Sequence, residues 1–166
     1  MTSTDTTEFS FLREQADELG IDAATPVVQR VQITLPDGRT LSALRYGETA
    51  PEVTFLHGAG LNAHTWDTTI VALGRPALSV DLAGHGDSSW REDAAYTPRA
   101  LAEDVIVALR QLTDRPQVLV GQSLGGLTAA AVAATAPPLI SDVVIVDITP
   151  GIDPTAGPAH LRAFYE

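Results

Sequence analysis

Short apolar runs alternate with longer segments of helical periodicity over most of this sequence, and this alternation restricts the fold more than any other feature. Each run has only three or four residues, whereas residues 63–73 and 98–112 repeat their apolar positions at helical spacing. Buried parallel strands joined by crossover helices produce such a pattern. The sequence therefore predicts an α/β fold with a mostly parallel sheet, whose strands include Val53–Leu56, Ala77–Val80, Val118–Val120 and Val143–Val146.

An antiparallel hairpin is expected to open the sheet. Residues 27–35 alternate between apolar and polar, with Val31, Ile33 and Leu35 directed inward, and Pro36-Asp37-Gly38 supplies turn residues before a second strand at Leu41–Tyr46. Alternation on both sides of a turn indicates two paired strands with one buried face.

Three parts are expected along the chain. Residues 1–25 form an N-terminal extension with a short amphipathic helix, on which Phe9, Leu12, Ala16 and Leu19 share a face. Residues 26–150 form the α/β core, which is incomplete because the pattern stops after about strand six. Residues 151–166 follow a Pro- and Gly-containing break and are interpreted as the start of a lid or as a linker.

Composition excludes several classes of partner. The net charge of −11 among 166 residues disfavours binding to nucleic acid or to an anionic membrane surface. Neither a secretory leader nor a transmembrane span is visible, so a cytoplasmic protein is expected. The absence of cysteine removes thiolate metal sites and cysteine nucleophiles, and no paired-histidine motif, P-loop or G-x-G-x-x-G motif occurs. We therefore expect no metal and no cofactor.

The strongest functional motif is Gly121-Gln122-Ser123-Leu124-Gly125, a G-x-S-x-G sequence between the strand at residues 118–120 and a helix-compatible run from Gly126 to Ala136. In this context the motif predicts a nucleophile elbow, where a sharp turn exposes the Ser123 hydroxyl above the sheet. The helix that follows would point its first amides at the site, so the Leu124 amide could donate to an oxyanion. The alternative is a flexible loop with a surface serine.

Two further loops follow strands. His57-Gly58-Ala59-Gly60 could bring the Ala59 amide to the nucleophile as a second oxyanion donor, and His57 is interpreted as a structural residue of this turn rather than as a base. The loop from Asp81 to Ser88 contains His85, and Asp81 is expected to accept hydrogen bonds from amides of its own turn.

Taken together and in this order, the three motifs resemble those of the α/β-hydrolase superfamily over residues 27–150. The resemblance implies Ser123 as nucleophile and the Ala59 and Leu124 amides as oxyanion donors. A serine at the elbow argues against the dehalogenase and epoxide hydrolase branches, which place aspartate there. The triad order Ser, acid, His makes Asp147 a candidate acid at the end of the sixth strand, although most members take the acid from the next strand. The alternative for Asp147 is a carboxylate that orders the following loop.

The general-base histidine of such a triad is absent from its expected place. His57, His64 and His85 precede the nucleophile, and His160 lies where a lid would begin. Because serine is a poor nucleophile without a base within hydrogen-bond reach, we expect this chain to be nearly inactive alone. The alternative is that His160 acts as the base. A separate C-terminal segment, or a second copy of the chain in a homo-oligomer, could supply the missing histidine.

Two classes of function remain open from the sequence. The first is a serine hydrolase that cleaves a small, largely apolar ester or related acyl compound through an acyl-enzyme on Ser123; carbon–carbon bond hydrolysis and haloperoxidase chemistry share these motifs. The second is a non-catalytic binding or partner-dependent module with the same fold.

Overall fold

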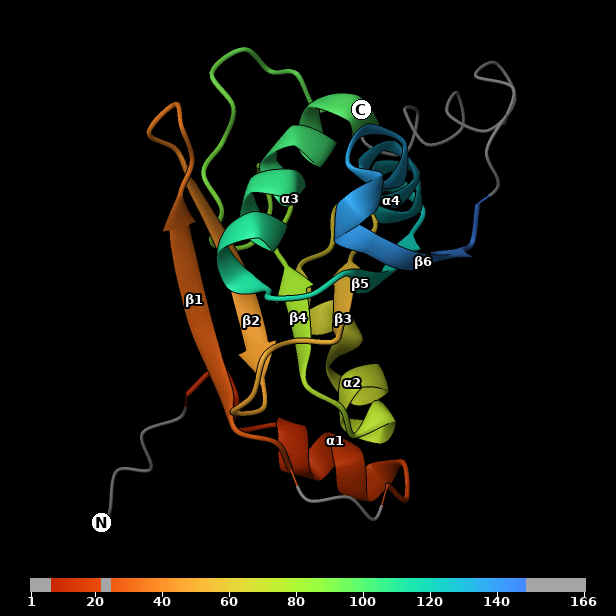
Figure 1. Ribbon diagram of the computed structural model, residues 1–166. Coiled ribbons are helices and arrows are strands. Elements are labelled where there is room, and N and C mark those ends of the chain that lie inside the picture. Colours follow the sequence, from red (N-terminus) through yellow and green to blue (C-terminus); the bar gives the residue numbers. More distant parts are fainter. Residues whose placement is uncertain (1–6, 22–24, 149–166) are drawn as a thin grey trace.

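A six-stranded mixed sheet forms the centre of the computed structural model, which describes residues 7–21 and 25–148 (Figure 1). The strand order is β1-β2-β4-β3-β5-β6. The first two strands pair antiparallel with each other, β2 also pairs antiparallel with β4, and the remaining neighbours are parallel. The strands span β1 Val28–Thr34, β2 Thr40–Tyr46, β3 Val53–Leu56, β4 Ala77–Val80, β5 Gln117–Gln122 and β6 Ile140–Val146. The predicted α/β class and the opening hairpin are confirmed.

Helices cover both faces of this sheet. Two of them, α3 and α4, pack together and cover one face, whereas α2 and α1 lie on the other. Within the described ranges, none of them is long and apolar enough to cross a bilayer. The helices are α1 Leu12–Glu18, α2 Asp67–Leu73, α3 Pro98–Leu112 and α4 Leu124–Thr135, with short 3-10 turns η1 at Ala63–Trp66 and η2 at Pro137–Leu139.

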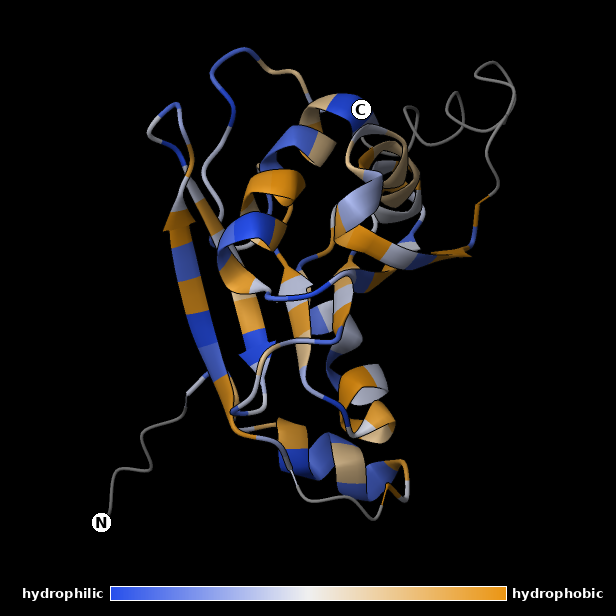
Figure 2. Cartoon of the chain, in the orientation of Figure 1, coloured by the Kyte–Doolittle hydropathy of each residue, from blue (hydrophilic) through white to orange (hydrophobic). Residues whose placement is uncertain are grey.

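The longest helix shows why these residues fold as they do. Thr97 caps α3 by accepting a hydrogen bond from the Ala100 amide (3.3 Å), and Pro98 fits the first turn, where no intrahelical donor is needed. Leu101, Val105 and Leu109 recur at helical spacing and are fully buried against the sheet. Figure 2 shows the corresponding alternation of hydrophobic and hydrophilic residues around α3 and along β1.

A second, smaller core lies on the opposite face of the sheet. It contains Phe55 of β3 and Trp66 of η1, whose rings lie 5.1 Å apart, together with Ile70 of α2. Side chains of β3 therefore reach both cores, because consecutive strand residues point to opposite faces. The two cores fix the carboxyl end of β3 from both sides.

The last described strand is less buried than its sequence suggested. The run Val143–Val146 was predicted as a buried strand, but Val144 and Val146 are 45% and 39% exposed. The reason is position: β6 is the edge strand and pairs only with β5 among the described residues. Its other side chains, Val143 and Ile145, are partly buried and lie on the face that α4 covers.

The N-terminal helix is shorter than predicted but is packed on the core. Leu12 and Ala16 are buried against Val71 of α2, with Phe9 partly buried beside them. Leu19, however, lies beyond the helix end and is 61% exposed, so the predicted shared face does not include it. The division of the chain into an extension, a core and a linker stays a prediction, and residues 149–166 lie outside the described part.

Candidate active site

Ser123 occupies a sharp turn between β5 and α4. Its backbone angles, φ 48° and ψ −112°, lie outside the regions that non-glycine residues ordinarily adopt, at a cost of about 1–3 kcal/mol. The surroundings hold it there: the Ser123 amide donates to the carbonyl of Val146 in β6 (2.9 Å), and the Ser123 carbonyl accepts from the Leu127 amide (3.0 Å). The hydroxyl makes no helix-capping bond and has no partner among the described residues.

Two glycines of the elbow allow the backbone to pack at very short range. A Cβ atom at Gly125 would overlap the carbonyl oxygens of Leu56 and His57, and one at Gly121 would overlap the backbone of Gly125. The start of α4 is therefore pressed directly against the end of β3, which no larger residue at position 125 would permit. This contact brings the loop after β3 beside the elbow.

The turn after β3 lies against the elbow. A Cβ at Gly58 would stand 3.7 Å from the carbonyl oxygen of Gln122. Ala59 is exposed, and within residues 7–21 and 25–148 the amides of Ala59 and Leu124 have no hydrogen-bond partner. Two unpaired amides thus flank the turn that carries the Ser123 hydroxyl.

His57 is built into this turn as a buried neutral ring. Its Nδ1 lies 2.7 Å from the carbonyl oxygen of Gly58, and its Nε2 accepts from the amide of Leu82 (3.0 Å). Burial lowers the pKa of His57 to about 4, so that the ring carries no charge at neutral pH. Both ring nitrogens contact backbone groups, so the ring stabilises the turn and neither nitrogen is free to contact Ser123.

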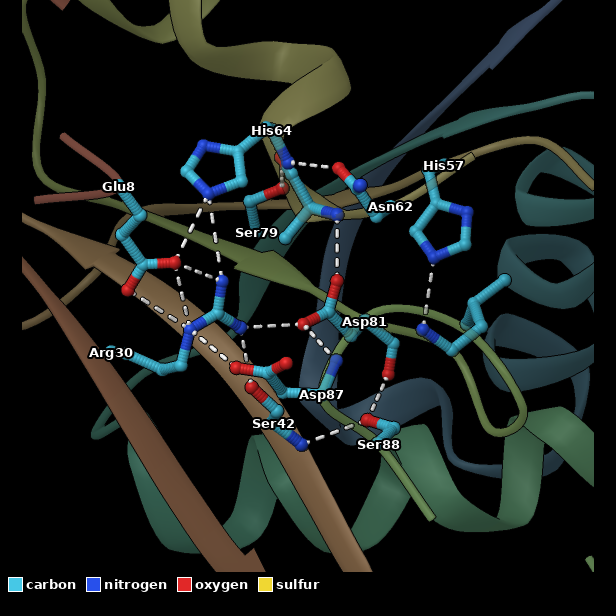
Figure 3. A network of polar contacts seen from close by, with 12 residues as sticks. Glu8, Arg30, Ser42, His57, Asn62, His64, Ser79, Asp81, Asp87 and Ser88 are labelled. Atoms are coloured by element: carbon cyan, nitrogen blue, oxygen red, sulfur yellow. Dashed lines mark hydrogen bonds and ion pairs between the residues drawn. The ribbon is translucent and has the colours of Figure 1, made fainter. Parts of the chain in front are cut away.

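Asp81 joins the loop after β4 to the loop after β3 (Figure 3). Its carboxylate accepts from the amide of Asp87 in its own turn (3.2 Å), as the sequence predicted. It also accepts from the amide of Ala63 (2.7 Å), at the start of η1, and is ion-paired with Arg30 of β1 (2.7 Å). The carboxylate is 1% exposed, so these contacts operate away from water.

Arg30 extends the same network to the N-terminal segment (Figure 3). Its guanidinium contacts Glu8, with Nε to Oε2 at 3.0 Å, as well as Asp87 (3.0 Å). His64 lies between Glu8 and Asp67; partial burial opposes protonation of its ring, but the two carboxylates raise its pKa overall. Arg30 and Glu8 were missed in the sequence analysis. Arg30 lies 22 residues from Glu8 and 51 residues from Asp81 in the chain, and no local motif marks these pairs.

Asp147 follows β6 immediately and has a positive φ of 63°. It is exposed and has no hydrogen-bond partner among the described residues, although its neighbour Val146 is bonded to Ser123. The structure thus brings Asp147 to the same end of the sheet as the elbow but does not link it to a histidine. His160, the other residue raised by the sequence, lies outside the described residues.

A surface cavity of about 580 Å³ opens beside the turn after β3. Its apolar walls include Leu61, Trp90 and Tyr96, and Trp90 is 75% exposed. No carboxylate or guanidinium lines it, and no cluster of metal-ligating side chains exists in the described part of the chain. The cavity begins at Ala59 and Gly60, so it adjoins the unpaired Ala59 amide.

Comparison with known proteins identifies the family. The model of the alpha/beta hydrolase fold family matches residues 51–165. The chain belongs to the α/β-hydrolase family. Esterase Rv0045c of Mycobacterium tuberculosis is 52% identical over 143 residues, which are 86% of this chain and 46% of that protein. A solved structure of the same esterase superposes with a TM-score of 0.83 at 48% identity, over 96% of this chain and 52% of that one.

A more distant relative has the same partial overlap. The mouse sn-1-specific diacylglycerol lipase ABHD11 is 38% identical over 120 residues, 70% of this chain and 38% of that protein. The chain therefore spans about half or less of the length of the relatives it matches.

Removal of Asp81 should destabilise the protein far more than removal of Glu8, although both carboxylates pair with Arg30. Asp81→Ala leaves Arg30 and two amides without their buried partner, which should cost about 3–5 kcal/mol, whereas the partly exposed Glu8→Ala should cost about 1 kcal/mol or less. Urea unfolding of the two variants measures both values. Equal losses would contradict the central role of Asp81.

Proposed function

We propose that this α/β-hydrolase cleaves esters through a covalent acyl-enzyme on Ser123. The observation that carries the proposal is the strained turn at Ser123, whose hydroxyl, like the nearby amides of Ala59 and Leu124, has no hydrogen-bond partner among the described residues. Backbone strain of this kind persists where function requires it. The esterase activity named for the M. tuberculosis relative supports the same reaction class.

In this mechanism the Ser123 oxygen attacks the ester carbonyl, and the amides of Ala59 and Leu124 donate to the oxyanion that forms. The Leu124 amide is also the first of α4, so the positive end of the helix dipole adds to the stabilisation. Each such donor is worth about 10²–10³ in rate. Expulsion of the alcohol gives the acyl-enzyme, and water then releases the acid and restores Ser123.

The general base of the reaction comes from outside the described residues. Each described histidine has its two ring nitrogens engaged elsewhere: His57 and His85 with backbone groups, and His64 with carboxylates. His160 or a histidine of another polypeptide, whether a separate C-terminal segment or a second copy of this chain, would supply it, with Asp147 as its acidic partner. Without a histidine from one of these sources, Ser123 should turn over very slowly.

The cavity beside the turn favours a neutral, apolar substrate. Leu61, Trp90 and Tyr96 present apolar surface, and the absence of charged carboxylates or guanidinium groups in its lining gives no anchor for an ionic group. Burial of such a substrate against the aromatic side chains would provide binding energy of about 25 cal/mol per Å². We assign the acyl or alcohol group of a small apolar ester to this cavity.

A fluorophosphonate probe tests the nucleophile directly, because it phosphonylates an activated serine. In its longest natural form the protein should be labelled at Ser123, as mapped by mass spectrometry, and Ser123→Ala should abolish the labelling. Ser141→Ala, which removes an exposed serine of β6, serves as the control and should still be labelled at Ser123. A folded, full-length protein that takes up no probe would instead favour a non-catalytic binding module.

Truncation of Trp90 tests the substrate class. Trp90→Ala should raise KM several-fold for esters with apolar groups and leave kcat nearly unchanged, because the side chain binds ground state and transition state alike. Phe11→Ala, which removes another exposed aromatic group, is the matched control. An unchanged KM for Trp90→Ala would show that the substrate occupies a different surface.

A further inference from the structure

Two histidines bond the loops after β3 and β4 to each other in a reciprocal way. His57, in the turn after β3, accepts a hydrogen bond from the amide of Leu82 in the loop after β4 (3.0 Å). His85, in the loop after β4, accepts one from the amide of Gly60 in the turn after β3 (3.2 Å). The two rings lie 4.9 Å apart, and we call this pair the histidine clasp.

The contacts assign the same neutral tautomer to both rings. Each Nδ1 faces a carbonyl oxygen of its own loop, Gly58 for His57 (2.7 Å) and Ala83 for His85 (3.1 Å), and must therefore carry the proton. Each Nε2 is then left with a lone pair and accepts an amide from the opposite loop. A ring that lost this tautomer would point a proton at an N–H group, and its half of the clasp would open.

The two halves of the clasp hold different parts of the turn. His57 is fully buried and fixes the base of the turn, next to β3. Ala59 and Gly60 are exposed, and Gly60 has a positive φ of 74°, so packing does little to fix the backbone there. His85 reaches this exposed part, and its bond to the Gly60 amide orients the peptide that directly follows Ala59.

We propose that His85 is a positioning residue, which holds the Ala59 amide in the direction that an oxyanion on Ser123 requires. The proposal rests on the hydrolase function proposed above and adds a requirement for an acceptor at the His85 side chain. It assigns no proton transfer to His85, because its Nδ1 proton is bound by Ala83 and its Nε2 by Gly60. A donor that is fixed before the reaction spares the reorganisation cost at the transition state.

Replacement of His85 by residues with and without an acceptor tests the proposal in the longest natural form of the protein. His85→Leu should lower kcat and the rate of labelling with a small fluorophosphonate by about 10-fold to 100-fold, since a displacement of about 1 Å can cost roughly 10² in rate. Because His85 also lines the cavity, a change in KM alone, with kcat and the labelling rate unaffected, would count against the proposal. His85→Gln, whose amide oxygen can accept from Gly60, should recover most of the rate. Equal rates in all three proteins, or equal losses in both variants, would overturn the proposal.

A measurement on the unmutated protein covers the case in which His85→Leu does not fold. The ¹⁵N shifts of the His85 ring at neutral pH should show a protonated Nδ1 and an unprotonated Nε2. The opposite tautomer would overturn the clasp. If the proposed hydrolase function is wrong, the unmutated protein will show no labelling of Ser123, although the predicted tautomer of His85 can still be observed. This result differs from failure of the clasp, in which Ser123 is labelled but the tautomer is the opposite one.

Discussion

The contact between the start of α4 and the end of β3 determines the geometry of the whole site. Only a residue without a side chain at position 125 lets the helix backbone approach the carbonyls of Leu56 and His57. This approach places the turn at residues 57–60 beside the elbow, and the bond from the Ser123 amide to Val146 ties the elbow to β6 on its other side. The groups of the proposed site thus depend on three adjacent parallel strands, β3, β5 and β6.

Around this contact, polar groups hold the loops in addition to the apolar side chains that these loops bury, such as Leu82 and Ala63. Asp81 fixes η1 and its own turn, Arg30 holds Asp81, and the histidine clasp joins the loops after β3 and β4. The bonds to Ala63 and Leu82 are buried and those to Arg30, Asp87 and Gly60 lie nearer the surface, and together they hold these loops in defined positions. A flexible turn would leave the Ala59 amide without a fixed direction, and rigidity is what electrostatic stabilisation of an oxyanion requires.

Local patterns in the sequence were enough to predict the elements and the order of the motifs. The helix at Pro98–Leu112 and the strands Val53–Leu56 and Ala77–Val80 agree with the structure residue for residue, because periodicity, caps and turn residues all act over a few positions. The exposure of Val144 and Val146 was not predictable in this way, since it depends on which strand lies at the edge of the sheet. Glu8, Arg30 and the partnership of His85 with Gly60 were missed for the same reason: each joins residues that are distant in sequence.

In the proposed reaction, the amides of Ala59 and Leu124 converge on one oxygen bonded to the atom that Ser123 attacks. A crystal structure of the protein after reaction with a fluorophosphonate tests this most directly. We expect a phosphonyl oxygen at about 2.7–3.1 Å from both amide nitrogens, with phosphorus bonded to Ser123 Oγ. An adduct on Ser123 whose phosphonyl oxygen points to solvent, with either amide turned away, would contradict it.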